Sequence, residues 1–165
     1  MAEYHGSCNP SLWRLVRKSA ILRAMSQENV DLHRRYIRAF NARDVEGLIV
    51  CCDPNIELHS TFAAADGAVY HGHDGMRVYH QDMTDAWGDE LGVETSAYFD
   101  LGERTLAFHV LHGRGRASGA DVALPIAQVS HWRDGLMIFF KGYPRREDAL
   151  RALEVSEDEL EPIAP

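Results

Sequence analysis

The chain has 165 residues, 45% of them hydrophobic and 25% charged, and its formal net charge at pH 7 is -8. This length and composition are those of one ordinary globular domain. The negative charge argues against nucleic-acid binding, which needs a basic face, and no apolar run approaches the roughly 20 residues that span a bilayer. Three cysteines, two of them adjacent at Cys51 and Cys52, make no disulfide framework, so we expect a reducing, cytoplasmic setting.

The two ends of the chain differ from its middle. Residues 1–25 are predicted to be an N-terminal extension, in which cations lie among apolar residues as in a short basic amphipathic helix. A membrane-surface anchor and a targeting peptide are the alternatives for this segment. Residues 26–153 are predicted to form the folded domain, with Ser26 as the N-cap of its first helix. Residues 154–165 carry five acidic side chains and predict an acidic, solvated tail.

The spacing of apolar residues predicts three helices in the first half of the chain. The first runs from Gln27 to Asn41. Asp44 caps a second, short helix that extends to Cys52, since Pro54 blocks its continuation. The third is Met76–Trp87. Five of its side chains share one face: Met76, Tyr79, His80, Met83 and Trp87.

Strands are predicted where the period of the pattern changes to two. Residues Asn55–Thr61 alternate as a strand does, and Phe62–Val69 is predicted to be a flexible loop over the mouth of a pocket. From Leu91 onward the alternation predicts four consecutive antiparallel strands, followed by a helix that begins near Arg145. The strands are Val93–Phe99, Arg104–Arg116, Val122–Trp132 and Leu136–Tyr143. This order predicts an α+β fold with helices packed on one face of a curved sheet.

Several phrases, in this order, resemble the SnoaL-like branch of the NTF2-like superfamily. They are ENVDLHRRYIRAFNARDVEGL, DPNIELHS, VYHGHDGMRVY, RGRASG and QVSHWRDGLMIFFKGYPRREDAL. The resemblance implies a cone-shaped barrel: three N-terminal helices on a strongly curved, mostly antiparallel sheet, with a short C-terminal helix and an apolar pocket. Members include ketosteroid isomerase, polyketide cyclases, limonene epoxide hydrolase and proteins with no known activity. Dimers through the sheet are common in the family, so the resemblance implies a homodimer.

The best-known mechanism of this family needs an interior carboxylate as a proton shuttle in a dry pocket. The three long strands after residue 103 carry none, and Gly142 stands where relatives often have a larger polar or acidic residue. Glu57 and Glu94 are the remaining strand carboxylates, and we expect both to face solvent. The sequence therefore gives little support to an aspartate base.

Histidine is the alternative base, because its ordinary pKa lies near neutral pH. His59 shares a strand face with Glu57, which could orient the imidazole, and His109 lies in mid-strand, where it could line a cavity. Tyr79 and Tyr143 are the candidate proton donors. The competing interpretation for each histidine is a partly buried side chain bonded to the backbone.

A metal site is the less favoured interpretation of His71, His73, Asp74 and His80, because an H-x-H pair on a loop is weak evidence and relatives vary at both histidine positions. We therefore expect neither a metal ion nor a cofactor.

Together these features predict a pocket for a small hydrophobic molecule. The candidate lining residues are Phe40, Phe62, Met83, Trp87 and Gln128. The favoured function is a ligand-binding protein without the interior aspartate base. One alternative is an enzyme for isomerisation, cyclisation or hydrolysis with a histidine base, and another is a dimerising interaction module.

Overall fold

The structure is a computed structural model that describes residues 27–60, 62, 67–115 and 118–165. The predicted N-terminal extension, residues 1–25, lies outside the described residues, as do residues 63–66 of the predicted loop Phe62–Val69. The helices pack with one six-stranded sheet, and helices and strands occupy separate parts of most of the chain. The predicted α+β fold is therefore confirmed.

The helices follow the apolar periodicity of the sequence, with some shifted ends. The first is described over residues 27–41, and the others are α2 (Val45–Val50), α3 (Gly72–Trp87), α4 (Arg146–Leu153) and the 3-10 turn η1 (Glu157–Glu159). The helix α3 begins four residues before the predicted Met76, and α2 ends two residues before the predicted Cys52. Among the residues that the structure describes, no helix is long and apolar enough to cross a membrane.

The strands form one mixed sheet in the order β2-β1-β6-β5-β4-β3. They are β1 (Cys52–Ser60), β2 (Ala68–His71), β3 (Gly92–Asp100), β4 (Arg104–Arg114), β5 (Asp121–Arg133) and β6 (Leu136–Tyr143). Among the strands that the structure describes, only the β1–β6 pairing is parallel; the pairings of β3, β4, β5 and β6 along the chain are antiparallel, as predicted.

The edge strand β2 corrects the predicted loop, because Val69 pairs with His59 of β1 instead of lying over a pocket mouth. Four residues are too short for a visible alternation, so this strand depends on its pairing with β1 and on no signal of its own. The strand β1 also begins earlier than predicted, at Cys52, and includes Pro54.

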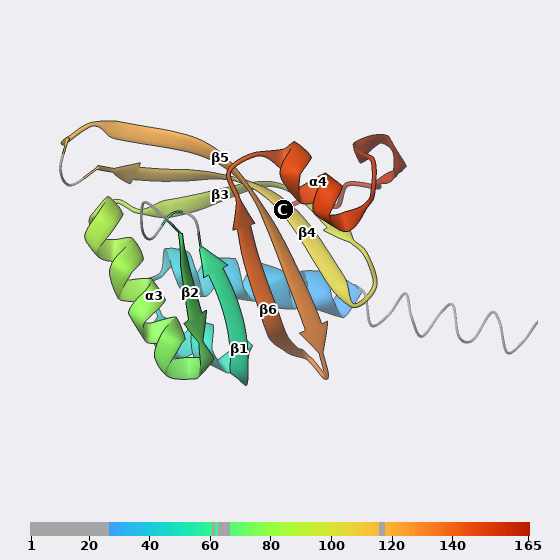
Figure 1. Cartoon of the computed structure of the whole chain (residues 1–165), viewed down its shortest axis with the longest axis horizontal. Helices are drawn as coiled ribbons and strands as arrows, with labels where there is room; N and C mark the ends of the chain where they lie inside the picture. The colour runs from blue at the N-terminus through green and yellow to red at the C-terminus, as the bar shows by residue number, and fades with distance from the viewer. Residues whose placement is uncertain (1–26, 61, 63–66, 116–117) are drawn as a thin grey trace, which may run out of the picture.

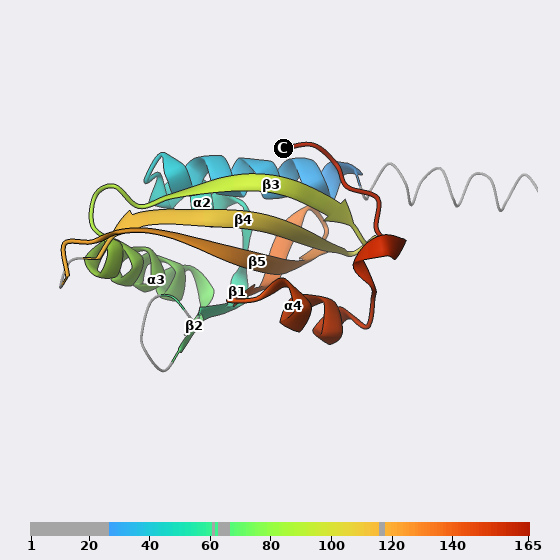
Figure 2. The same cartoon turned by 90° about the horizontal axis from the view of Figure 1, so that it is seen from above.

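Two layers of helices cover the two faces of the sheet. In Figure 2 the helix at residues 27–41 lies on one side of β3, β4 and β5, while α4 lies on the other. Figure 1 shows α3 beside β1 and the short strand β2. Ala149 and Leu153 of α4 pack against Phe108 and Val129 of the sheet. The remaining face of the sheet encloses the larger core together with the N-terminal helices.

The C-terminal segment is held along the edge strand β3, and its acidic side chains are exposed. Ile163 exchanges two backbone hydrogen bonds with Tyr98, at 2.9 and 2.7 Å, and packs against Val30 and Ala107. This bridge pairs part of the free edge of the sheet, which otherwise invites association with other chains.

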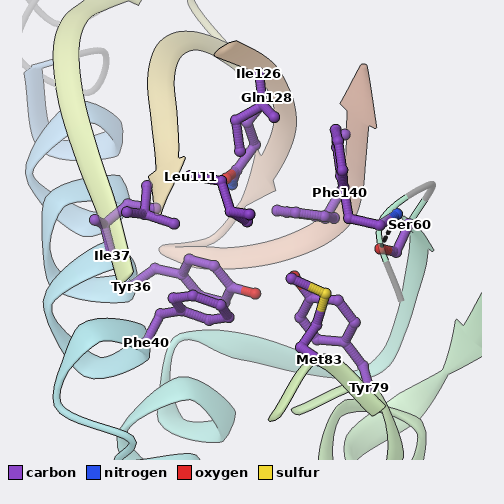
Figure 3. A pocket seen from close by; sticks show the side chains of 13 residues that line it. Tyr36, Ile37, Phe40, Ser60, Tyr79, Met83, Leu111, Ile126, Gln128 and Phe140 are labelled. Carbon is purple, nitrogen blue, oxygen red and sulfur yellow. Dashed lines mark hydrogen bonds between the residues drawn. The ribbon is translucent and has the colours of Figure 1, made fainter. Parts of the chain in front are cut away.

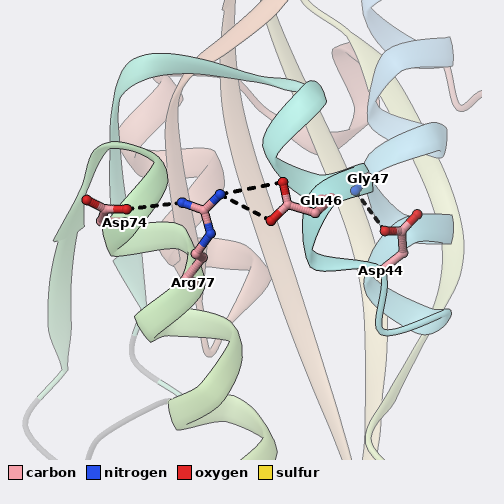
Figure 4. Close-up of polar contacts among 5 residues, drawn as sticks. All are labelled: Asp44, Glu46, Gly47, Asp74 and Arg77. Carbon is pink, nitrogen blue, oxygen red and sulfur yellow. Dashed lines mark hydrogen bonds and ion pairs between the residues drawn. The ribbon is translucent and has the colours of Figure 1, made fainter.

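Asp44 stabilises α2 by capping it, as the sequence predicts. Its carboxylate accepts a hydrogen bond from the backbone N–H of Gly47 at 2.9 Å (Figure 4). Arg77 of α3 donates to Glu46 at 3.1 Å and to Asp74 at 3.0 Å, in contacts that are largely exposed. The cap therefore contributes more to stability than the ion pairs do.

We expect Asp44→Ala to lower the free energy of unfolding by about 1 kcal/mol, because it leaves an N–H group of the first turn without its side-chain partner. Urea unfolding followed by circular dichroism measures the change. Glu46→Ala is the matched control, with a loss below about 0.5 kcal/mol, because it removes only an exposed ion pair. An equal loss in both variants would contradict the capping role.

Candidate ligand-binding site

A cavity lies between the N-terminal helices and the sheet, and its wall is mainly aromatic and aliphatic (Figure 3). Its lining residues are Tyr36, Ile37, Phe40, Ser60, Phe62, Tyr79, Met83, Val93, Leu111, Ile126, Gln128, Phe140 and Gly142. The volume open to the centre of a water molecule is about 20 Å³. This space suits roughly one water molecule.

The regular spacing of side chains along each helix and strand places these residues on the face that lines the cavity. On the first helix Tyr36 and Phe40 are one turn apart, and so are Tyr79 and Met83 on α3. On the strands, residues two apart share a face, so β5 contributes Ile126 with Gln128 and β6 contributes Phe140 with Gly142. The cavity is therefore built from one face of each of several elements.

Phe62 fills the space that the missing side chain of Gly142 leaves. A Cβ atom added to Gly142 would lie 3.4 and 3.6 Å from two carbons of the Phe62 ring. The backbone of Phe62 is held at both of its polar groups: its carbonyl accepts from Trp87 Nε1 at 2.9 Å, and its N–H donates to Ser60 Oγ at 3.2 Å. The gap expected at Gly142 is thus occupied by an aromatic ring.

The polar groups of the wall are uncharged at neutral pH. Among the described residues that line the cavity there is no Asp, Glu, His, Lys or Arg. Burial raises the pKa of Tyr36 and of Tyr79, so both phenols keep their protons. Tyr36 donates to Met76 Sδ at 3.9 Å. The wall offers hydroxyl groups and the Gln128 carboxamide for hydrogen bonding and no group for proton abstraction near pH 7.

A layer of buried polar side chains adjoins the cavity one helical turn from Tyr36. His33 Nδ1 lies 2.9 Å from Thr105 Oγ1, and Thr105 Oγ1 accepts a hydrogen bond from Trp132 Nε1 at 2.9 Å. His109 Nδ1 lies 2.9 Å from Thr95 Oγ1. In the part of the chain that the structure describes, the buried side-chain atoms without a hydrogen-bond partner are Nε2 of His33 and Nε2 of His109.

Both of these histidines are neutral at pH 7. Burial lowers the pKa of His33 well below 6.5, and a charge on His109 would lower it further, while Gln128 opposes the shift. Burial lowers the pKa of His109 to about 3, again opposed by Gln128. A group with this pKa is a weak base at neutral pH, which argues against His109 as a general base.

Five of the nine candidate residues line the cavity, and four do not. Phe40, Phe62, Tyr79, Met83 and Gln128 are in the wall. The expectation that Trp87 lines the pocket is corrected: it supports the wall through its hydrogen bond to Phe62. His109 belongs to the buried polar layer.

His59 and Tyr143 lie on the outer face of the sheet, because each is one residue away from an inward-facing neighbour, Ser60 or Gly142. His59 Nε2 lies 2.5 Å from Glu57 Oε1, so the predicted pair forms, but outside the cavity. Tyr143 packs beside α4, with Lys141 Nζ 5.0 Å from its ring centre. Their predicted roles as pocket base and donor are not supported by these positions.

Sequence reasoning missed the site role of His33 and Tyr36. The helical spacing of His33 with the apolar residues Val30, Ile37 and Phe40 was the usable signal, because it places the histidine on the face that the structure buries.

Two histidines of α3 have separate surroundings. His73 Nε2 lies 3.0 Å from the carbonyl oxygen of Cys52, whereas the centre of the His80 ring lies 6.4 Å from the centre of the Phe40 ring. Within the described ranges, no three His, Cys, Asp or Glu side chains are grouped so that they could hold a metal ion.

With this geometry in place, the comparisons with known proteins identify the family. Residues 33–139 match the SnoaL-like domain family. The chain belongs to the SnoaL-like family. The comparison with curated proteins gives no match.

Solved structures share the NTF2-like fold of this SnoaL-like chain. An NTF2-like protein of unknown function from Burkholderia pseudomallei is 18% identical with a TM-score of 0.65, and 75% of this chain and 95% of that chain are covered. TerC, co-crystallised with polyporic acid, is 17% identical with a TM-score of 0.64 over 77% of this chain and 98% of that chain. A protein of ketosteroid isomerase-like fold from Catenulispora acidiphila, in complex with trimethylamine, is 15% identical with a TM-score of 0.61 over 77% and 95%. At these identities the likeness shows the fold alone.

The buried histidines make stability depend on pH in a defined window. Unfolded histidines take up protons near pH 6.5, whereas the folded pKa of His33 is well below that value and that of His109 is about 3. Their contribution is fully present above pH 6.5 and is lost as the pH falls toward the folded pKa, at roughly 1.4 kcal/mol per pH unit for each histidine. We expect a marked fall in the urea midpoint between pH 7 and pH 5.

His109→Leu tests the origin of this pH dependence, because leucine has a similar volume and does not titrate. The variant is expected to show a smaller fall than the wild type between pH 7 and pH 5, and some fall should persist because the pKa values of His33, His80 and His131 are also lowered by burial. The exposed His112→Leu is the control and should keep the full fall. A wild-type midpoint that is constant over this range would contradict burial of neutral histidines.

Proposed function

We propose that this SnoaL-like chain binds a small, uncharged, hydrophobic molecule in the cavity and does so without the interior aspartate base. The observation that carries the proposal is the composition of the wall, in which the described lining residues are aromatic, aliphatic or neutral polar. A charged ligand would lose its hydration there without gaining a counter-ion. An apolar ligand would gain free energy from leaving water.

The four polar wall residues give the ligand an orientation. Tyr36, Ser60, Tyr79 and Gln128 come from different elements, so they approach the cavity from several sides. Figure 3 shows Tyr36, Tyr79, Met83 and Phe140 converging on a common centre. A mainly apolar wall with a few fixed polar groups is typical of small-molecule sites. The solved structures of TerC with polyporic acid and of the Catenulispora protein with trimethylamine support small-molecule binding by this fold.

The small volume of the cavity implies that Phe62 moves when a ligand binds. A toluene-sized molecule needs far more than the present 20 Å³. The Phe62 ring is the wall group packed on Gly142, so its displacement opens space without disturbing the sheet. The free energy of burying a toluene molecule is on the order of -4 kcal/mol, which corresponds to a millimolar dissociation constant.

We expect the protein to bind toluene, with chemical-shift changes at Phe62 and Met83 in a nuclear magnetic resonance titration. Gly142→Val should weaken this binding at least about tenfold, because its methyl groups take up the space between the strand and the Phe62 ring. The control is Lys141→Val, on the adjacent outward position, with unchanged affinity. Saturable binding that is equal in both variants would exclude this cavity as the site.

The second candidate function is the acid–base enzyme, and the buried histidines next to Gln128 are the feature that favours it. Their low pKa requires a ligand to change their environment before either acts as a base at neutral pH. Loss of turnover in His109→Leu for any substrate found by screening would support the enzyme.

The homodimer through the sheet, and the interaction module based on it, also stay proposals. Light scattering after size exclusion tests both, and a strict monomer at high concentration would exclude them.

A further inference from the structure

The buried polar layer next to the cavity has two ring nitrogens without a well-formed hydrogen bond, and the acceptor beside them is the Gln128 carboxamide. The side chains of His33 and His109 are 0% and 1% exposed, and Nε2 of each lacks a partner. Their ring centres are 5.9 Å apart. A buried donor or acceptor without a partner is costly, so such pairs call for an explanation by function.

The hydrogen bonds of Thr105 are compatible with a proton on Nε2 of His33. Trp132 Nε1–H can only donate, so the hydroxyl oxygen of Thr105 accepts from it. The hydroxyl hydrogen of Thr105 is then free to be donated to His33 Nδ1, at 2.9 Å. A neutral imidazole that accepts at Nδ1 carries its hydrogen on Nε2. In this tautomer the unpaired atom of His33 is a donor, which agrees with the effect of the neighbouring Gln128 carboxamide on the pKa of His33.

Tyr98, Thr95 and His109 can be assigned donor and acceptor roles in the same way. The Thr95 hydroxyl lies 3.3 Å from the hydroxyl of Tyr98 and 2.9 Å from His109 Nδ1. When Tyr98 donates to Thr95 and Thr95 donates to Nδ1, the proton of His109 is also on Nε2. The result is two buried N–H donors on facing elements, the first helix and β4.

Gln128 connects these two donors with the cavity. It lines the cavity, and its Nε2 donates to Ser130 Oγ at 3.0 Å. The carboxamide also raises the pKa of both histidines, as a neighbouring hydrogen-bond acceptor does. Gln128 thus belongs to the wall that meets the ligand and to the layer that holds the unpaired donors.

We propose that Nε2 of His33, Nε2 of His109 and the Gln128 carboxamide form a polar subsite for one uncharged oxygen of the ligand, a hydroxyl or a carbonyl. The subsite rests on the proposed function, because Gln128 also belongs to the wall of the proposed ligand cavity. An oxygen with two lone pairs can accept from both N–H groups. A carboxylate is disfavoured, because both rings are neutral and the described lining residues include no cation. The ligand class is a mainly apolar, neutral molecule with a hydroxyl or carbonyl oxygen at its leading end.

Phenol and toluene are the probes that test this subsite, because they have nearly the same shape and differ by a hydroxyl in place of a methyl group. Titrations of the full chain at pH 7, followed by nuclear magnetic resonance, give both dissociation constants. We expect phenol to bind at least about tenfold more tightly than toluene, because it satisfies donors that toluene leaves unpaired. The preference should fall to near one in His33→Leu and in His109→Leu. The control His112→Leu, on the same strand but on the surface, should keep it.

A second measurement on the wild-type protein keeps the proposal testable if a leucine variant fails to fold. Nitrogen chemical shifts of the histidine rings should show protons on Nε2 of His33 and His109, and phenol but not toluene should shift both. Equal binding of phenol and toluene by the wild-type protein would overturn the subsite and leave the proposed function intact. Protons on Nδ1 would also overturn the subsite alone. If neither probe binds, the proposed function fails, and the subsite fails with it.

Discussion

The two-residue period of the β-strand is the constraint on which the site depends. Along β6, Phe140 and Gly142 face the cavity, while Lys141 and Tyr143 face outward. Along β5, Gln128 meets the cavity, while Ala127 and Val129 pack in the cluster that includes α4. Because one sheet separates two cores, a shift of one residue would exchange polar wall groups for apolar ones. The pairing register of β4, β5 and β6 therefore determines both the wall and the packing of α4.

The polar layer shows how buried histidines can remain in such a core. His33 and His109 each have one ring nitrogen satisfied by a threonine hydroxyl, and both rings stay neutral because burial disfavours their charged forms. The aromatic rings of Tyr98 and Trp132 pack around His33, at centre distances of 5.1 and 6.0 Å. A layer like this costs stability where its donors are unpaired, so a ligand oxygen that pairs them would recover part of that cost.

The described residues of the cavity wall include no carboxylate, which the acid–base mechanism of the family needs. The sequence shows that the long strands β4, β5 and β6 carry no acid on their inner faces, and the cavity wall agrees with this. The space at Gly142 is taken by Phe62, which comes from beyond the end of β1 and is held by Trp87. An apolar ring over a glycine makes this part of the cavity hydrophobic.

The amino-acid sequence by itself determined the fold class, because apolar periodicity is a local property that survives without tertiary contacts. It indicated the helix faces of Phe40, Tyr79 and Met83, and the strand position of Gln128, each of which lies in the wall. It missed β2, which exists only through pairing with β1. Only the tertiary structure decided that His59 and Tyr143 face outward, that Phe62 covers Gly142, and that His33 meets His109. These outcomes depend on register and on contacts between residues far apart in the chain, such as the 72 positions between His33 and Thr105, and no local pattern encodes them.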